Sequence, residues 1–329
     1  MVRAMLIAVL ITIGLQGNAQ TESRITRYNY FFLEAIRQQE MGNLAAAFDL
    51  LNHARDINPK APEVYYEIAG YYVAMQNSKA ARYNFEQAAK LAPDNSTYLE
   101  KLGQFYISQN NYEDALTTYE QLYTSNKTRE DVLQILYQLY GAQNNYKKMI
   151  EMIERMELLS GASEQLSLTK MQIYEQMGDK RKAQAELLRL VQKNPLELNY
   201  RVMLGNWLLQ NNKKKEAYNE YQTVLKEDPN NAAAQLSLLD YYRDTKNEKM
   251  VDELTRKLLE SKKTEKETKM ALLRQAIMDN QDDSAKDSLE VIKLFNRVLS
   301  YPQEDADIVL MKAAYLNLKH APEDSINSV

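Results

Sequence analysis

Apolar and polar positions along this chain recur with a period of 34 residues. The clearest marker is a series of tyrosines that a leucine interrupts once, with the members Tyr72, Tyr106, Tyr140, Tyr174, Leu208 and Tyr242. A fixed period of this length predicts small helical units copied end to end, because each unit then buries its apolar face on its neighbours. The chain is therefore expected to be an array without one central core.

The units share one register. A frame that begins at Tyr28 predicts seven units over residues 28–265, starting at residues 28, 62, 96, 130, 164, 198 and 232, with no insertion or deletion. Position 20 of the frame is small in most units and position 24 is large, as in Ala81 and Phe85. The two positions lie on one helical face because they are four residues apart. Four units close on a proline, which ends a helix.

Composition agrees with helix nearly throughout and with no strong electrostatic field. Only nine Gly and seven Pro are present, so the chain has little material for tight hairpins, and an all-α fold is expected. The formal net charge is −4, from 41 basic and 45 acidic residues. Nucleic acid is therefore not the expected partner, because its binding needs a concentrated basic surface.

The repeated positions resemble the tetratricopeptide repeat. That family has a small residue at position 8, Tyr at 11, Gly near 15, Ala at 20, an aromatic residue at 24 and Pro at 32. The second unit has Ala69, Tyr72, Ala81, Phe85 and Pro93 at five of these places. The resemblance implies an α-solenoid of two antiparallel helices per unit, wound into a right-handed superhelix whose first helices line a concave groove. It also implies that the position-11 tyrosines lie between the helices of one unit.

The N-terminus has the features of a cleaved export signal. Arg3 precedes an apolar stretch from Ala4 to Leu15, and small residues up to Ala19 follow. Residues 1–19 are therefore expected to be the signal peptide and residues 20–27 a lead-in to the array. The Ala19–Gln20 junction resembles signal ends common in Bacteroidetes. These features predict a soluble bacterial protein that is periplasmic or otherwise exported; retention of the segment as an anchor is the alternative.

The C-terminal region departs from the register. Residues 266–302 predict an irregular eighth hairpin, with a first helix from Met270 to Met278, extra residues from Gln281 to Asp287 and a second helix from Leu289 to Leu299. Residues 303–329 predict a final helix and tail, or the start of a further repeat. The segment 304–319 is apolar around nearly its whole circumference, although a terminal cap should have a polar outer face. It is therefore expected to continue into a longer array, to contact a partner, or to self-associate.

No motif in the sequence indicates catalysis. His53 and His320 are the only histidines and cysteine is absent, which leaves too few ligands for a typical zinc site. The sequence also lacks a Gly-rich phosphate loop and a Gly-x-Ser-x-Gly turn. The expected protein is not an enzyme and has no metal and no small-molecule cofactor.

The resemblance implies that positions 2, 5, 9, 12 and 13 of each first helix face the groove. Four successive units have a side-chain amide at position 9, namely Gln104, Gln138, Gln172 and Asn206, and further groove positions add Gln134, Gln176 and Gln210. An amide donates and accepts, so a row of amides can bind the backbone of an extended peptide. The alternative is that glutamine is only a helix-compatible surface residue.

The first two units offer a different surface in the same groove. Phe32, Ile36, Tyr66 and Val73 form an apolar patch that can accept a hydrophobic anchor; alternatively, the patch packs against the start of the mature chain. These features predict a non-enzymatic scaffold that holds an extended protein segment, in envelope assembly or secretion. The alternative is a specificity or sensor module of a longer envelope enzyme or signalling protein.

Overall fold

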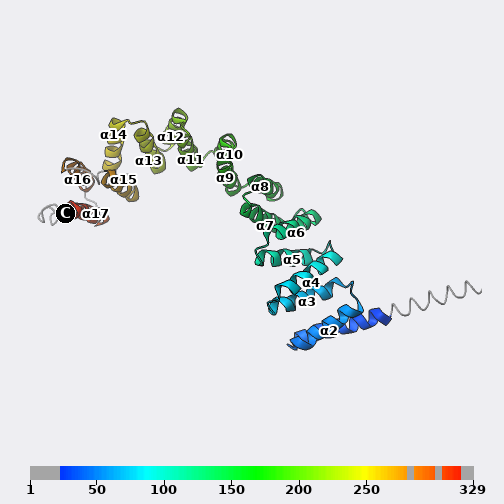
Figure 1. Cartoon of the computed structure of the whole chain (residues 1–329). Coiled ribbons are helices and arrows are strands. Elements are labelled where there is room, and N and C mark those ends of the chain that lie inside the picture. Colours follow the sequence, from blue (N-terminus) through cyan, green and yellow to red (C-terminus); the bar gives the residue numbers. More distant parts are fainter. Residues whose placement is uncertain (1–22, 280–284, 301–305, 320–329) are drawn as a thin grey trace, which may run out of the picture. The chain divides into compact units, whose positions relative to one another are not determined.

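The computed structural model describes residues 23–279, 285–300 and 306–319, and all regular elements in these ranges are helices. The all-α prediction is thus confirmed, as an array of helical hairpins (Figure 1). The export signal and residues 20–22 of the lead-in lie outside the described residues, whereas residues 23–27 belong to the first described helix. None of the described helices is both long enough and apolar enough to cross a membrane.

The helices follow the period of the sequence. A helix over residues 23–40 comes first. The first helices of the following hairpins are α3 (Pro62–Ala74), α5 (Ser96–Ser108), α7 (Glu130–Ala142), α9 (Glu164–Gln176), α11 (Leu198–Gln210), α13 (Ala232–Asp244) and α15 (Lys266–Asp279). The second helices are α2 (Leu44–Ile57), α4 (Ser78–Leu91), α6 (Tyr112–Ser125), α8 (Tyr146–Ser160), α10 (Lys180–Lys193), α12 (Lys214–Glu227) and α14 (Glu248–Glu260). From α3 onwards, consecutive first helices begin 34 residues apart, as do consecutive second helices from α2 to α14.

The end of the array corrects one detail of the predicted eighth hairpin. Helix α15 begins at Lys266, four residues before the predicted Met270, and is still in register. The shift appears only at α16 (Ala285–Leu299), which begins three residues after the place that the spacing from Glu248 gives. Of the predicted extra residues Gln281–Asp287, the first four lie outside the described residues and the last three belong to α16, which begins four residues before the predicted Leu289. Helix α17 (Ala306–Leu318) follows.

The turn between the two helices of a hairpin contains a residue with a positive φ, and the residue after it caps the N-terminus of the second helix in most units. Position 15 of the frame has a positive φ in all seven units: in Gly42, Gln76, Asn110, Asn144, Gly178, Asn212 and Lys246. The next residue then caps the second helix in most units, as Asn77 does by accepting from the backbone N–H of Ala80 at 3.1 Å. Such a cap satisfies a donor that the helix leaves free.

The aromatic residue at position 24 packs over the small residue at position 8 of the same hairpin. A Cβ atom added to Gly103 would lie 2.7 Å from Cε2 of Tyr119, and one added to Gly205 would lie 2.4 Å from Cε1 of Tyr221. Tyr119 and Tyr221 are almost fully buried. Each glycine thus makes the space that lets α5 approach α6 and α11 approach α12.

Two of the position-11 tyrosines, Tyr106 and Tyr140, also link neighbouring units, which the family resemblance did not lead us to expect. Tyr106 on α5 donates a hydrogen bond to Glu86 on α4 of the preceding unit, at 2.8 Å. Tyr140 on α7 donates in the same way to Glu120 on α6. Both ring systems are buried, so each tyrosine combines apolar burial with a polar link between units.

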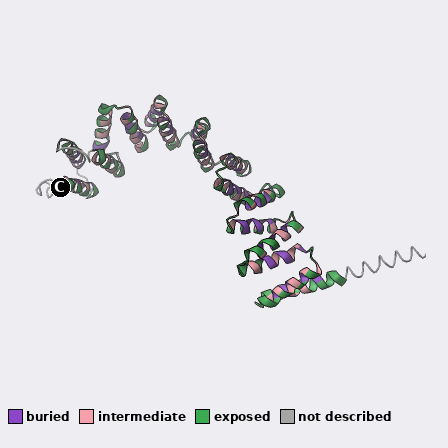
Figure 2. Ribbon diagram, in the orientation of Figure 1, coloured by how far each residue is buried: buried purple, intermediate pink, exposed green. Residues whose placement is uncertain are grey.

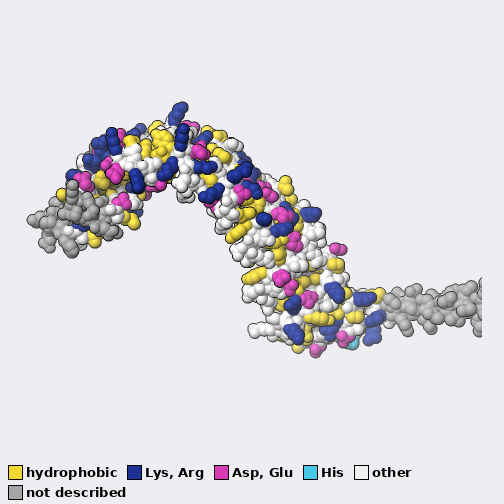
Figure 3. Space-filling model, turned by 45° about the horizontal axis from the view of Figure 1, so that its top comes forward, with side chains coloured by type: hydrophobic (Ala, Val, Ile, Leu, Met, Phe, Trp, Pro, Cys, Tyr) yellow, Lys and Arg dark blue, Asp and Glu magenta, His cyan; other side chains and the backbone are white. Residues whose placement is uncertain are grey.

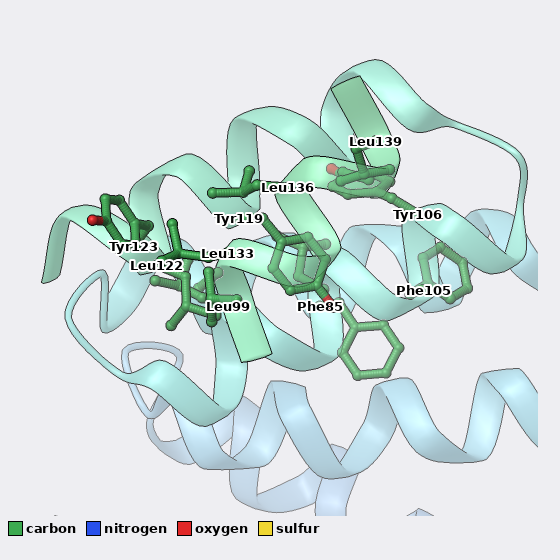
Figure 4. Packing of buried hydrophobic residues seen from close by; sticks show 14 of the residues in the cluster. Phe85, Leu99, Phe105, Tyr106, Tyr119, Leu122, Tyr123, Leu133, Leu136 and Leu139 are labelled. Atoms are coloured by element: carbon green, nitrogen blue, oxygen red, sulfur yellow. The ribbon is translucent and has the colours of Figure 1, made fainter. Parts of the chain in front are cut away.

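The chain divides into two compact units, Met1–Leu166 and Ser167–Val329. Buried residues lie where neighbouring helices meet (Figure 2). The main cluster of the first unit joins Leu99 of α5, Leu122 of α6 and Leu133 of α7, among others (Figure 4). In the second unit, Phe295 of α16 packs with Tyr315 of α17 at 6.2 Å between ring centroids.

Helix α17 is covered on one face only. Ile308, Tyr315 and Leu316 are buried within the second unit, whereas Leu310 is 65% exposed and Leu318 60% exposed. We expected the apolar surface of this helix to be covered, and its own unit covers one part of that surface. A contact of the exposed face with a partner stays a prediction.

Candidate functional site

The predicted groove glutamines lie exposed on first helices. Gln104, Gln134 and Gln138 belong to the first unit, and Gln172, Gln176 and Gln210 belong to the second unit; all six are exposed. The side chain of Gln104 accepts from Nζ of Lys101 at 3.4 Å. Their accessibility is compatible with peptide binding and with a simple solvent-facing role, so their function stays a prediction.

Asn206 differs from the glutamines. Its side chain is half-buried, and its Oδ1 accepts a hydrogen bond from the hydroxyl of Tyr221 at 2.8 Å. This contact satisfies a polar group of a fully buried tyrosine, which is costly to leave without a partner. Asn206 thus has a structural role whether or not it also touches a partner.

The first unit has a hollow between the first helices α3 and α5, called the α3–α5 pocket below. It is lined by Tyr66, Glu67, Gly70 and Val73 of α3, Phe85 of α4, and Lys101, Gln104, Phe105 and Ser108 of α5. Its volume is about 440 Å³, within the range of about 300–1,000 Å³ typical of ligand sites. Two residues of the predicted apolar patch, Tyr66 and Val73, and one predicted amide, Gln104, thus lie around the same hollow.

Aromatic rings form the base of the pocket. Phe85 and Phe105 lie 5.4 Å apart between ring centroids, and Tyr66 lies 6.3 Å from Phe85. Figure 4 shows Phe85 and Phe105 beside each other at one side of the buried cluster. A Cβ atom added to Gly70 would meet nothing within 4 Å. The absence of a side chain at this position therefore keeps the wall of the pocket open.

One wall of the pocket carries a desolvated carboxylate. Glu67 is half-buried, and burial raises its pKa, while a hydrogen bond from Gln39 opposes the rise. On the other wall, Lys101 is exposed to solvent. Sequence reasoning missed both charges because it considered only the family's groove positions. The available signal was Gly70, at a position where the five following units have a polar side chain.

Phe32 and Ile36, the other members of the predicted apolar patch, are half-buried and do not line the pocket. Phe32 stacks on Tyr28 with 6.0 Å between ring centroids, and Tyr28 is buried. Part of the predicted patch is therefore used in packing the first hairpin.

The second unit has a larger hollow of about 670 Å³ among α13, α14, α15 and α16. Its charged lining residues are Arg243, Lys249, Asp252, Glu253, Arg256, Asp279, Glu290 and Arg297. Basic and acidic groups are equal in number, so this hollow does not favour a ligand of either sign.

Within the described ranges, no three His, Cys, Asp or Glu side chains are grouped so as to hold a metal ion. On the face shown in Figure 3, basic and acidic side chains are also interspersed.

Comparison with known families agrees with the repeat. Residues 66–129 and 168–232 match the family described as tetratricopeptide repeat. The first match contains α4, α5 and α6 and every lining residue of the α3–α5 pocket, and the second contains α10, α11 and α12. A comparison with curated proteins gave no significant match.

Two solved structures are similar to this chain at low sequence identity. The structure of Naa15/Naa10 bound to HypK-THB is 15% identical with a TM-score of 0.57, covering 88% of this chain and 44% of that one. The chain thus spans less than half the length of that relative. A tetratricopeptide repeat protein from Parabacteroides merdae is also 15% identical with a TM-score of 0.39, covering 82% of this chain and 98% of that one. These likenesses concern the fold alone.

Proposed function

Because tetratricopeptide repeats make up residues 66–129 and 168–232 of this chain, we propose that the protein is a non-enzymatic scaffold that holds a segment of another protein against its first helices. The observation that carries the proposal is the α3–α5 pocket, an open hollow with an aromatic base on the exposed side of two such helices. A convergent hollow of this kind is the default place to expect a ligand. The Naa15/Naa10 structure, which holds HypK-THB, is compatible with this role.

We propose further that the scaffold works outside the cytoplasm, in envelope assembly or secretion. The support is the N-terminal sequence, in which an apolar stretch from Ala4 to Leu15 is followed by small residues up to Ala19. N-terminal sequencing of the protein purified from its native host should give a mature chain that begins at Gln20. A chain that retains residues 1–19 would favour the anchored alternative.

A pocket-filling variant tests the binding role. Gly70→Trp places an indole in the hollow, where a Cβ atom meets nothing within 4 Å, so it should block binding without disturbing the fold. Affinity capture from the native envelope should lose its specific partner with Gly70→Trp and keep it with Ala185→Trp, an exposed site in the second unit. If both variants keep the same partners, the α3–α5 pocket is not the binding site.

The exposed glutamines form a separable part of the proposal. Gln104→Ala, Gln138→Ala and Gln172→Ala together should weaken binding of the captured partner while leaving helicity unchanged, because they remove amides that can bond a peptide backbone. Unchanged affinity would exclude the amides but not the pocket. Asn206 is unsuitable for this variant because its side chain accepts from Tyr221.

A further inference from the structure

The chemistry of the α3–α5 pocket narrows the kind of segment that it can hold. Its wall bears the carboxylate of Glu67, and its base consists of aromatic rings, including Phe85 and Phe105. A purely apolar occupant would cover Glu67 further without giving it a partner, which costs free energy. The occupant should therefore offer a group that compensates this carboxylate.

Glu67 differs from two other partly buried carboxylates of the first unit, which have cationic partners. Glu86 is paired with Arg82 at 2.6 Å and Glu100 with Arg129 at 3.0 Å. Among the described residues no cation forms an ion pair with Glu67, and burial raises the pKa of its carboxyl group. A partner can therefore supply a positive charge that the fold leaves out.

In two places of the first unit, an arginine both lies over an aromatic ring and pairs with a carboxylate. The guanidinium of Arg82 lies 5.5 Å from the centroid of Tyr106 and pairs with Glu86. That of Arg155 lies 4.8 Å from the centroid of Tyr123 and pairs with Glu151. Arginine suits such sites because its planar group stacks on a ring, bonds a carboxylate in a fixed geometry and has an apolar stem.

Lys101 on the opposite wall does not reverse this preference. Its side chain is exposed, and its Nζ lies 3.4 Å from the amide oxygen of Gln104. An exposed charge is screened by solvent and salt, whereas a half-buried charge is screened much less. Glu67 therefore determines the sign of the preferred occupant, and Lys101 reduces its affinity only modestly.

We propose that the α3–α5 pocket binds an arginine side chain of an extended partner segment, with the stem against Phe85, Phe105 and Val73 and the guanidinium against Glu67. This inference rests on the proposed scaffold function and specifies the partner at one position. The residues of the segment on either side of this arginine would contact the exposed side chains of α3 and α5.

The test uses a displayed library of random linear peptides selected on the full chain and counterselected on Gly70→Trp. The surviving peptides, which need the open pocket, should share an arginine. For a synthetic survivor, replacing that arginine by its neutral isostere citrulline should weaken binding to the wild-type protein about tenfold or more, because a charge-assisted hydrogen bond is lost. This comparison requires no protein variant and is independent of folding.

Protein variants then locate the contact. Glu67→Gln should also weaken the arginine peptide about tenfold or more, and it should have little further effect on the citrulline peptide. Lys101→Gln should bind the arginine peptide at least as tightly as the wild type, and Glu113→Gln, at an exposed site on α6, is the matched control. Circular dichroism should show equal helicity for all three.

The outcomes separate the two proposals. Surviving peptides that share an aliphatic or aromatic anchor and bind Glu67→Gln normally would overturn the arginine inference and leave the scaffold function intact. A selection that yields no peptide dependent on the open pocket would overturn both.

Discussion

Tyr106 donates a hydrogen bond to Glu86 of the preceding repeat, across 2.8 Å. Arg82 lies over the ring of Tyr106 and pairs with the same carboxylate at 2.6 Å. In an array, stability is the sum of the repeats and of the interfaces between neighbours. A residue at such an interface should therefore affect the cooperativity of unfolding as well as its midpoint.

The first prediction concerns this link. Tyr106→Phe should lower the free energy of unfolding by about 1 kcal/mol, because it removes the hydrogen bond and keeps the buried ring. Tyr106→Ala should cost about 3 kcal/mol, because it also removes the ring. Urea denaturation followed by circular dichroism measures both values. Tyr83→Phe, at a side chain that is 55% exposed, should change little; an equal loss there would show that the hydroxyl link is unimportant.

The second prediction compares two helical glycines. Gly103→Ala should destabilise the protein by about 1–3 kcal/mol, because the added methyl group meets the buried ring of Tyr119 at 2.7 Å. Gly70→Ala should instead stabilise it by about 0.5–1 kcal/mol, since a Cβ there meets nothing within 4 Å and alanine favours the helix. Thermal melting of the two variants gives the signs, and equal shifts would contradict the packing of Tyr119 over Gly103.

The third prediction is unfolding at alkaline pH. Burial raises the pKa of Tyr119 from 10.0 to about 12 and that of Tyr242 also to about 12. The folded chain thus favours the neutral phenols, whereas tyrosines of the unfolded chain ionise near pH 10.0. Stability should be complete below pH 10.0 and should fall as the pH rises towards 12.

Ultraviolet absorbance of tyrosinate, recorded together with circular dichroism, checks this dependence. The buried tyrosines should ionise together with the loss of helicity. Ionisation of every tyrosine near pH 10.0 with helicity unchanged would contradict the burial that raises the pKa values.

The fourth prediction concerns an ion pair inside the second unit. Nζ of Lys170 on α9 lies 2.9 Å from Glu186 on α10, with side chains only 5% and 13% exposed. Glu186→Ala should cost about 3 kcal/mol or more, because it leaves a buried ammonium without its main counter-charge. The double variant Lys170→Met with Glu186→Leu should recover most of that loss.

Urea denaturation measures these variants against Glu151→Ala in the first unit, whose side chain is 38% exposed. That control should lose less than about 1 kcal/mol, as is usual for an exposed pair. A double variant no more stable than Glu186→Ala would show that lost packing, and not the lost ion pair with Glu186, lowers the stability.

The regular part of the fold could be predicted from the sequence because its determinants are local and repeated. Alternation of small and large residues such as Ala81 and Phe85 revealed the helices and their period. The sequence could not show that Tyr106 bonds to Glu86, since the two residues are 20 positions apart and belong to different repeats. Likewise, the insertion before α16 concealed that α15 is still in register.

The candidate site was predictable only in part. Tyr66, Val73 and Gln104 were found because the family resemblance indicates which helical positions are accessible. Glu67 was missed because its significance depends on burial, which requires the neighbouring helices to be placed. Asn206 resembled the glutamines in sequence, yet in space it accepts from Tyr221.

The positive φ at position 15 makes the turn of each repeat a place where the stability of that repeat can be changed. Gln76 and Lys246 hold φ values of 57° and 54°, a conformation that costs residues with a Cβ atom about 1–2 kcal/mol. Replacing either by glycine would relieve that cost, less what glycine loses in entropy on folding. Each of these turns connects the two helices of one hairpin. A glycine substitution there should therefore change the stability of one repeat at a time, without changing any side chain of the α3–α5 pocket.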